Sequence, residues 1–178
     1  MIRPARPGDV PAIHRLMRDL AGYEKSLDEV TATEEDLHRL LFCEHPAVFA
    51  HVATSRDVAV GFALWFLNYS TWAGRHGIYL EDLYVMPEER GRGYGRALLA
   101  ELAGICAERG YGRLEWSVLN WNAPSIAFYE SLGAEAMREW TTYRLSGAAL
   151  HVLGAGRVPA PGRGHPGDED MTATRARR

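Results

Sequence analysis

Residues 77–96 read GIYLEDLYVMPEERGRGYGR, and this stretch decides the fold. Its first ten residues are branched, aromatic and apolar apart from two acids, which is typical of a strand, and Pro87 ends that strand. Three glycines at alternate positions follow. Residues 95–109 then place their apolar side chains on one helical face, and Gly110 stops the helix. The predictions below start from this order of elements: a strand, a glycine-rich loop and a helix.

The glycine loop has the composition of an anion-binding site. Without Cβ atoms its backbone N–H groups can converge on an anion, and the following helix start adds unpaired N–H groups and a positive dipole end. Arginines among the glycines add charged donors. The spacing fits neither the dinucleotide fingerprint nor the phosphate loop of nucleotide hydrolases. We therefore predict a pyrophosphate cradle made of Arg90, Gly91, Arg92, Gly93, Tyr94, Gly95 and Arg96.

The rest of the chain supplies the other elements of an α/β fold. Asp9 and Thr33 are expected to cap two helices, and Arg56-Asp57 is expected to turn a tight hairpin. The predicted elements are helices over 10–22, about 34–41, 95–109 and 124–132, strands over 47–54, 58–69, 77–86 and 113–119, and a last strand or hairpin within 136–146. Together they predict a mixed, mostly antiparallel sheet flanked by about four helices, with the strands over 77–86 and 113–119 parallel.

Composition limits the class of protein. We predict one domain over residues 1–146 and a Gly/Pro/Arg-rich tail without regular structure over 147–178. The net charge of −3 divides into −5 before residue 151 and +2 after it, which argues against a nucleic-acid partner and agrees with a cationic one. We expect no secretory signal, no membrane span, no disulfide from Cys43 and Cys106, no metal site, and a cytoplasmic location.

Two motifs resemble the GNAT acetyltransferase superfamily. Arg90 to Gly95, after a strand that ends in YVMP, looks like its acetyl-coenzyme A (acetyl-CoA) site, and residues 122–134, NAPSIAFYESLGA, resemble its later cofactor-facing helix. The resemblance implies a GNAT-like fold over residues 2–146. It also implies cofactor contacts from the residues of the cradle and from Leu83, Tyr84, Val85, Asn122 and Ser125.

A narrower resemblance concerns the acceptor. Tyr23-Glu24, residues 69–74 (YSTWAG) and residues 79–87 (YLEDLYVMP) look like the diamine acetyltransferases, especially the thialysine type. The polyamine enzyme typically has an acid where this chain has Ser70. The resemblance implies a homodimer and a β-bulge at Glu81-Asp82 that turns both acids toward one pocket.

A site that acetylates an amine needs acidic side chains to bind the ammonium and to accept its proton. An alkylamine with a pKa near ~10.4 is neutral in only about one molecule in ~2,500 at pH 7, so a site must bind the cation and then remove its proton. Glu81 and Asp82 interrupt an otherwise apolar strand, and we predict Glu81 as the base and Asp82 as the ammonium anchor. Tyr23 and Glu24 are further substrate candidates, and Trp72 is expected to cover an alkylammonium by a cation–π contact.

Tyr129 completes the predicted catalytic set. A phenol with a pKa near ~10 can protonate a departing thiolate, and the later motif presents Tyr129 for that role. A Cys43/His45 nucleophile pair lacks a third, orienting group. Three functions stay open: acetylation of a small primary amine (diamine, polyamine or thialysine- or lysine-like side chain), acetylation of a protein lysine or N-terminus, and cofactor sensing without catalysis. We favour the first.

Overall fold

The computed structural model of the chain describes residues 1–158 and contains one five-stranded sheet. Its strands, in sheet order, are β1 (Ile2–Pro4), β2 (Val48–Ser55), β3 (Val58–Ser70), β4 (Arg75–Val85) and β5 (Leu114–Trp116). Every neighbouring pair is antiparallel except β4 and β5, which are parallel. The mixed, mostly antiparallel sheet predicted from the sequence is confirmed.

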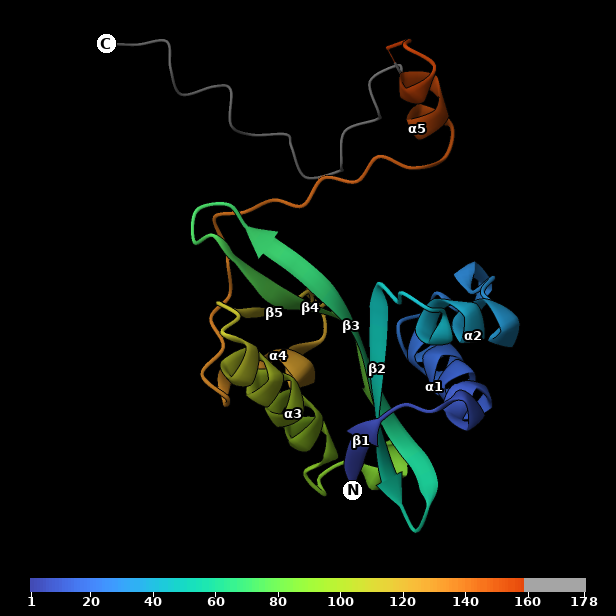
Figure 1. Cartoon of the computed structure of the whole chain (residues 1–178), viewed down its shortest axis with the longest axis vertical. Helices are drawn as coiled ribbons and strands as arrows, with labels where there is room; N and C mark the ends of the chain where they lie inside the picture. The colour runs from blue at the N-terminus through green and yellow to red at the C-terminus, as the bar shows by residue number, and fades with distance from the viewer. Residues whose placement is uncertain (159–178) are drawn as a thin grey trace. The chain divides into compact units, whose positions relative to one another are not determined.

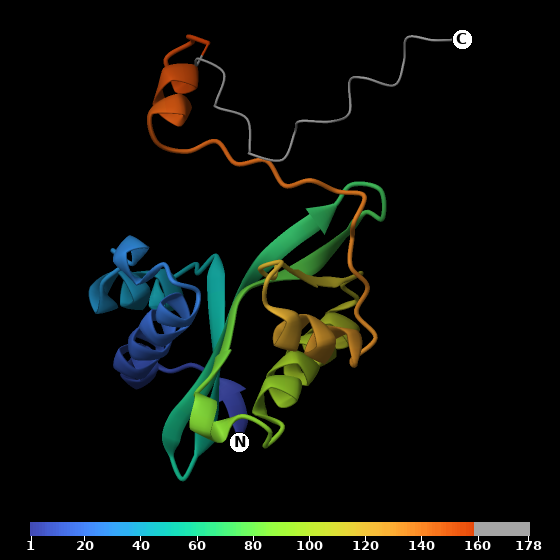
Figure 2. The ribbon, with the colours of Figure 1, turned by 180° about the vertical axis from the view of Figure 1, so that it is seen from behind.

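Helices cover both faces of this sheet. Helices α1 (Val10–Tyr23) and α2 (Glu34–Phe42) lie on one face and α3 (Tyr94–Arg109) lies on the other (Figures 1 and 2). The α1/α2 face is sealed by one apolar cluster in which Ile13, Leu16 and Phe62 are completely buried. With α4 (Ala123–Glu130) and α5 (Gly147–Gly154), the described residues contain five α-helices where about four were expected. None of them is both long enough and apolar enough to cross a membrane.

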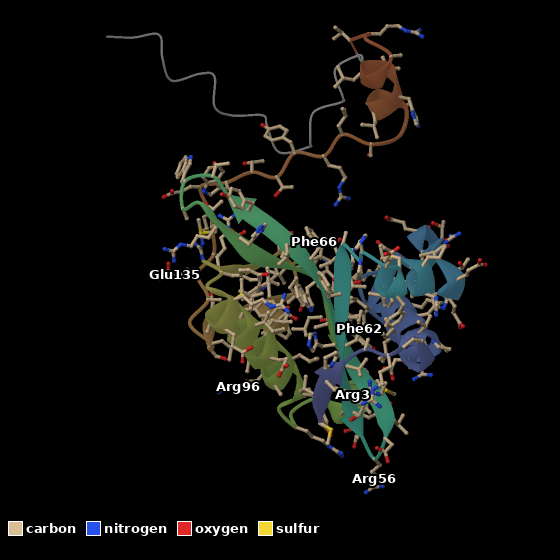
Figure 3. The ribbon with its side chains drawn as sticks, viewed as in Figure 1. Arg3, Arg56, Phe62, Phe66, Arg96 and Glu135 are labelled. Carbon is tan, nitrogen blue, oxygen red and sulfur yellow. The ribbon has the colours of Figure 1, made fainter. Side chains whose placement is uncertain are left out.

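Several elements follow directly from local sequence signals. Arg56 and Asp57 both adopt positive φ, 49° and 64°, as a two-residue hairpin of the primed type requires, and Arg56 lies at the hairpin tip (Figure 3). Thr33 caps α2, since its hydroxyl accepts a hydrogen bond from the Asp36 N–H at 3.1 Å and the Asp36 carboxylate accepts one from the Thr33 N–H. Both predictions are confirmed.

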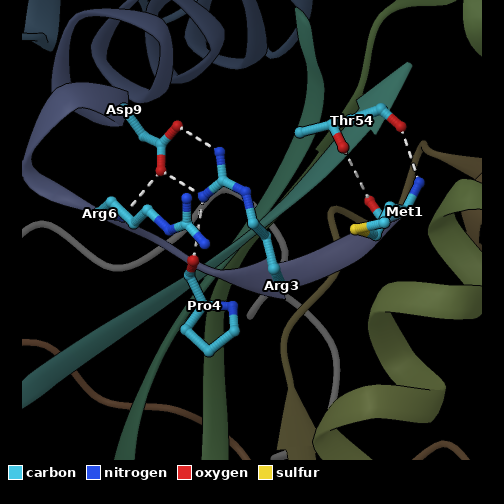
Figure 4. A network of polar contacts seen from close by, with 6 residues as sticks. All are labelled: Met1, Arg3, Pro4, Arg6, Asp9 and Thr54. Atoms are coloured by element: carbon cyan, nitrogen blue, oxygen red, sulfur yellow. Dashed lines mark hydrogen bonds and ion pairs between the residues drawn. The ribbon is translucent and has the colours of Figure 1, made fainter. Parts of the chain in front are cut away.

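The N-terminus differs from the expectation. Residues 2–4 form β1, a strand that the sequence did not predict, and Asp9 does not cap α1 with its side chain. Its carboxylate instead accepts bonds from Arg3 at 2.6 and 2.8 Å and from the Arg6 N–H at 2.7 Å (Figure 4). The hydrogen bond from Arg3 is the main reason why the pKa of Asp9 lies below its usual value. An ion pair with Arg3, six residues earlier in the chain, has replaced the side-chain cap.

The chain divides into two compact units, Met1–Ile126 and the residues from Ala127 onward. In the second unit, the described residues contain no strand within 136–146, so the predicted last strand is wrong. The prediction that everything after 146 lacks regular structure is also wrong for Gly147–Gly154, because its apolar residues form α5. Residues 159–178 of the predicted tail lie outside the described residues.

Candidate active site

The glycine loop adopts the geometry of an anion cradle. Gly91 and Gly93 have φ of 75° and 84°, a region that residues with a Cβ rarely adopt, and open space lies where their Cβ atoms would be. Gly93 is the N-cap of α3, and among residues 1–158 no side chain caps that helix. At the N-terminal end of α3, the first intrahelical hydrogen bond runs from the Ala97 N–H to Gly93 O at 2.9 Å. The earlier N–H groups of α3 are therefore free to bind an anion.

The three arginines of the cradle differ in their partners. Arg90 donates from Nε to Val85 O at 2.9 Å, and within residues 1–158 it forms no salt bridge with a carboxylate. Arg92 pairs with Glu89 at 3.1 Å, so part of its charge is already balanced. Arg96 is exposed in the first turn of α3 (Figure 3). Arg90 is the best placed of the three to bind phosphate oxygens.

The β4 edge beside the loop is open. Strand β5 pairs with β4 only from Ile78 to Leu80, so in the described part of the chain no strand pairs with that edge at residues 83–85. These residues, Leu83, Tyr84 and Val85, are the ones predicted to offer backbone groups to the cofactor arm. The uncapped start of α3 and the free edge of β4 flank the same loop.

The predicted β-bulge is present at Glu81. Leu64 of β3 lies opposite Asp82, whereas the next residue, Trp65, lies opposite Leu80, so Glu81 is the extra residue of β4. Because of it, Asp82 shares the α1/α2 face with Leu64, although Leu80 faces the α3 side with Trp65. Glu81 itself is exposed. The bulge brings an acid to the sheet face beside the end of α1.

Asp82 belongs to a cluster of acids. Burial, reinforced by the charges of Glu81 and Glu24, raises the pKa of Asp82 from 3.8 to about 6. Burial also raises the pKa of Glu24, which follows Tyr23 at the end of α1. Three carboxylates that repel one another in a partly dehydrated place form a site that a cation would stabilise.

Tyr23 and Asn122 connect the two ends of the site. The Tyr23 hydroxyl donates to Asn122 Oδ1 at 3.1 Å, and the same oxygen accepts the Ser125 N–H at 3.3 Å. Asn122 is buried and caps the start of α4, so its side-chain oxygen is already used within the protein. Trp121, which the sequence analysis missed, packs on Tyr23 with ring centroids 5.7 Å apart. Its only sequence signal was its position beside Asn122.

Of the remaining predicted residues, Trp72 is not brought to this cluster. Trp72 lies in the turn between β3 and β4 with 91% of its surface exposed. It follows Ser70, which is itself six strand positions, or roughly 20 Å, from Leu64, the residue opposite Asp82. A cation–π contact from Trp72 to an amine at Asp82 of the same chain is therefore wrong. Tyr129 lies half-buried in α4 within the second unit, where its ring centroid is 5.4 Å from that of Phe128. Its predicted catalytic role stays a prediction.

The remaining reactive side chains lie apart from one another. Cys43 is exposed and Cys106 is buried, where burial raises the pKa of its thiol and makes the nucleophilic thiolate scarcer. Within residues 1–158 no three His, Cys, Asp or Glu side chains gather in a way that would hold a metal ion.

Comparison with known proteins gives a consistent result. A family model described as "Acetyltransferase (GNAT) family" matches residues 12–134. Thialysine N-epsilon-acetyltransferase of Bos taurus is 39% identical over 86% of this chain and 96% of that protein. L-ornithine N5-acetyltransferase of Arabidopsis thaliana is 32% identical over 85% of this chain and 86% of that protein. Among solved structures, an integron cassette protein of V. cholerae superposes with a TM-score of 0.73 at 28% identity, covering 86% and 96% of the two chains.

Proposed function

Since the chain belongs to the GNAT family of acetyltransferases, we propose that it transfers the acetyl group of acetyl-CoA to a small primary amine. The observation that best supports this proposal is the β-bulge, which places Asp82 near Glu81 and Glu24 and beside the open β4 edge. The matched relatives named for thialysine and ornithine support a diamine or an amino acid with a terminal amine as the acceptor class. A polyamine is a less favoured member of the same class.

The residues of the loop fit acetyl-CoA. Its pyrophosphate matches the uncapped start of α3, the open space at Gly91 and Gly93, and the unbalanced charge of Arg90. Arg92, Tyr94, Gly95 and Arg96 line the same loop, and residues 83–85 offer an unpaired strand edge to a peptide-like arm. Asn122 and Ser125 support this proposal indirectly, because they fix the start of α4 and bond to each other.

The acids divide the work on the amine. Bound acetyl-CoA supplies an acetyl thioester, which only an unprotonated amine can attack. Asp82 binds the incoming ammonium together with Glu24, and that cation in turn favours the charged form of Asp82. Glu81, exposed at the bulge, accepts the proton directly or through water. Tyr129 is proposed to deliver a proton to the departing sulfur atom.

An amine panel tests the proposal. We expect coenzyme A release with thialysine, ornithine, lysine or short diamines, weaker release with spermidine, and the weakest with a histone-like peptide, because the acids suit a small cation. Preference for the peptide would favour a protein acetyltransferase. Cofactor binding without release for any amine would favour a sensor.

Two variants separate the base from the acid. Glu81→Gln is expected to lower kcat/KM at pH 7 by roughly 10²–10⁴-fold and to recover partly near pH 10, where free amine becomes abundant. Tyr129→Phe is expected to lower kcat by roughly 10–10³-fold with much less recovery at high pH. Steady-state pH profiles of both variants check this. Wild-type turnover in Tyr129→Phe, with chemistry rate-limiting, would remove the acid role.

The assembly and the location are predictions that rest on the sequence. We propose a homodimer, as the resemblance to the diamine acetyltransferases implies, and the cytoplasm stays its predicted location. Light scattering at micromolar concentration should give twice the chain mass of 19.8 kDa. A monomer mass would contradict the assembly.

A further inference from the structure

The end of α1 is closed by two backbone hydrogen bonds where it meets the site. Lys25 adopts φ of 62°, the Ser26 N–H bonds to Ala21 O at 2.9 Å, and the Lys25 N–H bonds to Gly22 O at 3.2 Å. This is a Schellman closure with lysine where glycine is usual. It fixes the backbone of the two preceding residues, Tyr23 and Glu24. Lys25 also contacts the site, since its Nζ lies 5.9 Å from the centre of the Trp121 ring.

Tyr23 contacts residues of the glycine loop and residues at the start of α4. The Arg90 guanidinium lies 5.3 Å from the centre of the Tyr23 ring and 5.5 Å from that of Tyr84, so it is held between two aromatic rings. On the other side, Tyr23 packs on Trp121 and donates to Asn122 at 3.1 Å. One side chain thus joins the end of α1, the glycine loop and the start of α4.

The next residue along the chain faces the amine. Glu24 is close enough to Asp82 for its charge to contribute to the electrostatics there, and Glu24 itself is partly buried. Tyr23 and Glu24 are consecutive residues, and the closure of α1 restrains the stretch of backbone that carries both side chains. The phosphate-binding arginine and an amine-binding acid are therefore connected through a single tyrosine.

We propose that Tyr23 is a positioning residue that couples the two substrates: pyrophosphate bound at Arg90 fixes the Tyr23 ring, which sets Glu24 for the ammonium. The proposal rests on the proposed function and adds a direction to it. Coenzyme A binding strengthens amine binding, and by linkage the amine strengthens coenzyme A binding by the same factor. Tyr23 needs no contact with either reacting atom for this role.

Calorimetry with coenzyme A, which carries no acetyl group, measures the coupling without turnover. For the wild-type chain we expect saturating coenzyme A to tighten the binding of thialysine or ornithine by about 5–20-fold. Tyr23→Leu should reduce that factor to about 2 or less, since both aromatic contacts are lost. Tyr23→Phe keeps the ring on Arg90 and Trp121 and should retain most of the coupling.

Tyr111→Leu is the matched control, because Tyr111 is a partly buried tyrosine whose ring packs on His76, away from the loop. It should keep the wild-type coupling. Tryptophan fluorescence gives a second measurement. Coenzyme A alone should change the emission of the wild-type chain, and Trp121→Phe should remove most of that change. Wild-type protein that acetylates the amine but binds the two ligands independently would overturn this inference alone, as would full coupling in Tyr23→Leu. Failure to acetylate any amine would instead count against the proposed function.

Discussion

Replacing Asp82 with asparagine should make the protein more stable and almost inactive. The amine loses its partly buried partner, and removing one member of a buried charge pair typically costs about 2–5 kcal/mol, so kcat/KM should fall by roughly 10²-fold or more. The side chain keeps its size, so packing against Leu64 is preserved. Steady-state assays with the best amine of the panel measure the loss.

The stability gain follows from the raised pKa. Because the pKa of Asp82 in the folded chain is about 6 and that in the unfolded chain is near 3.8, the unfolded chain releases this proton first as pH rises. Asp82 therefore lowers the stability of the wild-type protein progressively between about pH 4 and pH 6, and the whole penalty is present above pH 6. The difference corresponds to about 3 kcal/mol at most, and relaxation around the acid makes about 1–3 kcal/mol the expected range.

Thermal unfolding at pH 5 and pH 8 checks this. Asp82→Asn should melt about 2–10 °C above the wild type at pH 8 and show a smaller advantage at pH 5. Glu108→Gln is the control, since Glu108 is an exposed acid on α3, and it should alter neither activity nor melting. A less stable Asp82→Asn protein at pH 8 would mean that the carboxylate makes favourable contacts that outweigh its burial.

Sequence reasoning succeeded where one local interaction determines the structure. The Arg56-Asp57 turn, the Thr33 cap and the glycine loop each depend on the conformational preference of a few adjacent residues. The bulge at Glu81 is different: resemblance to the family predicted it, whereas the alternation of the strand alone would have placed Glu81 and Asp82 on opposite faces.

It failed where the partner lies outside the local motif that was used for the prediction. Asp9 has the sequence context of a helix cap. Its carboxylate instead accepts two charge-assisted hydrogen bonds from Arg3. The three residues of β1 are too few to give a periodic pattern, and only their pairing with β2 makes them a strand. Trp121 likewise could be assigned to the site only from the structure, in which it packs on Tyr23, 98 residues earlier in the chain.

Gly93→Val should nearly abolish cofactor binding. Valine is β-branched and strongly disfavours a φ of 84°, so the loop must either keep the strain or turn its N–H groups away. Open space surrounds the position in the protein, which means that the new side chain projects into the volume proposed for the pyrophosphate. We expect the Kd for coenzyme A, measured by calorimetry, to rise by about 10²-fold or more, through lost backbone donors and direct obstruction.

Backbone strain at Gly93→Val would also destabilise the fold, so weaker binding could result from partial unfolding. A second variant separates the two causes. Gly110 ends the same helix with φ of 67° and likewise has open space at its Cβ position, yet it lies at the far end of α3 from the loop. Gly110→Val should lower the melting temperature about as much as Gly93→Val, because both place a β-branched residue in the left-handed region at a cost of roughly 1–2 kcal/mol or more. Only the Gly93 variant should lose the cofactor. Equal coenzyme A affinity in the two folded variants would show that the pyrophosphate binds elsewhere, and the arginines of the loop would then need another explanation.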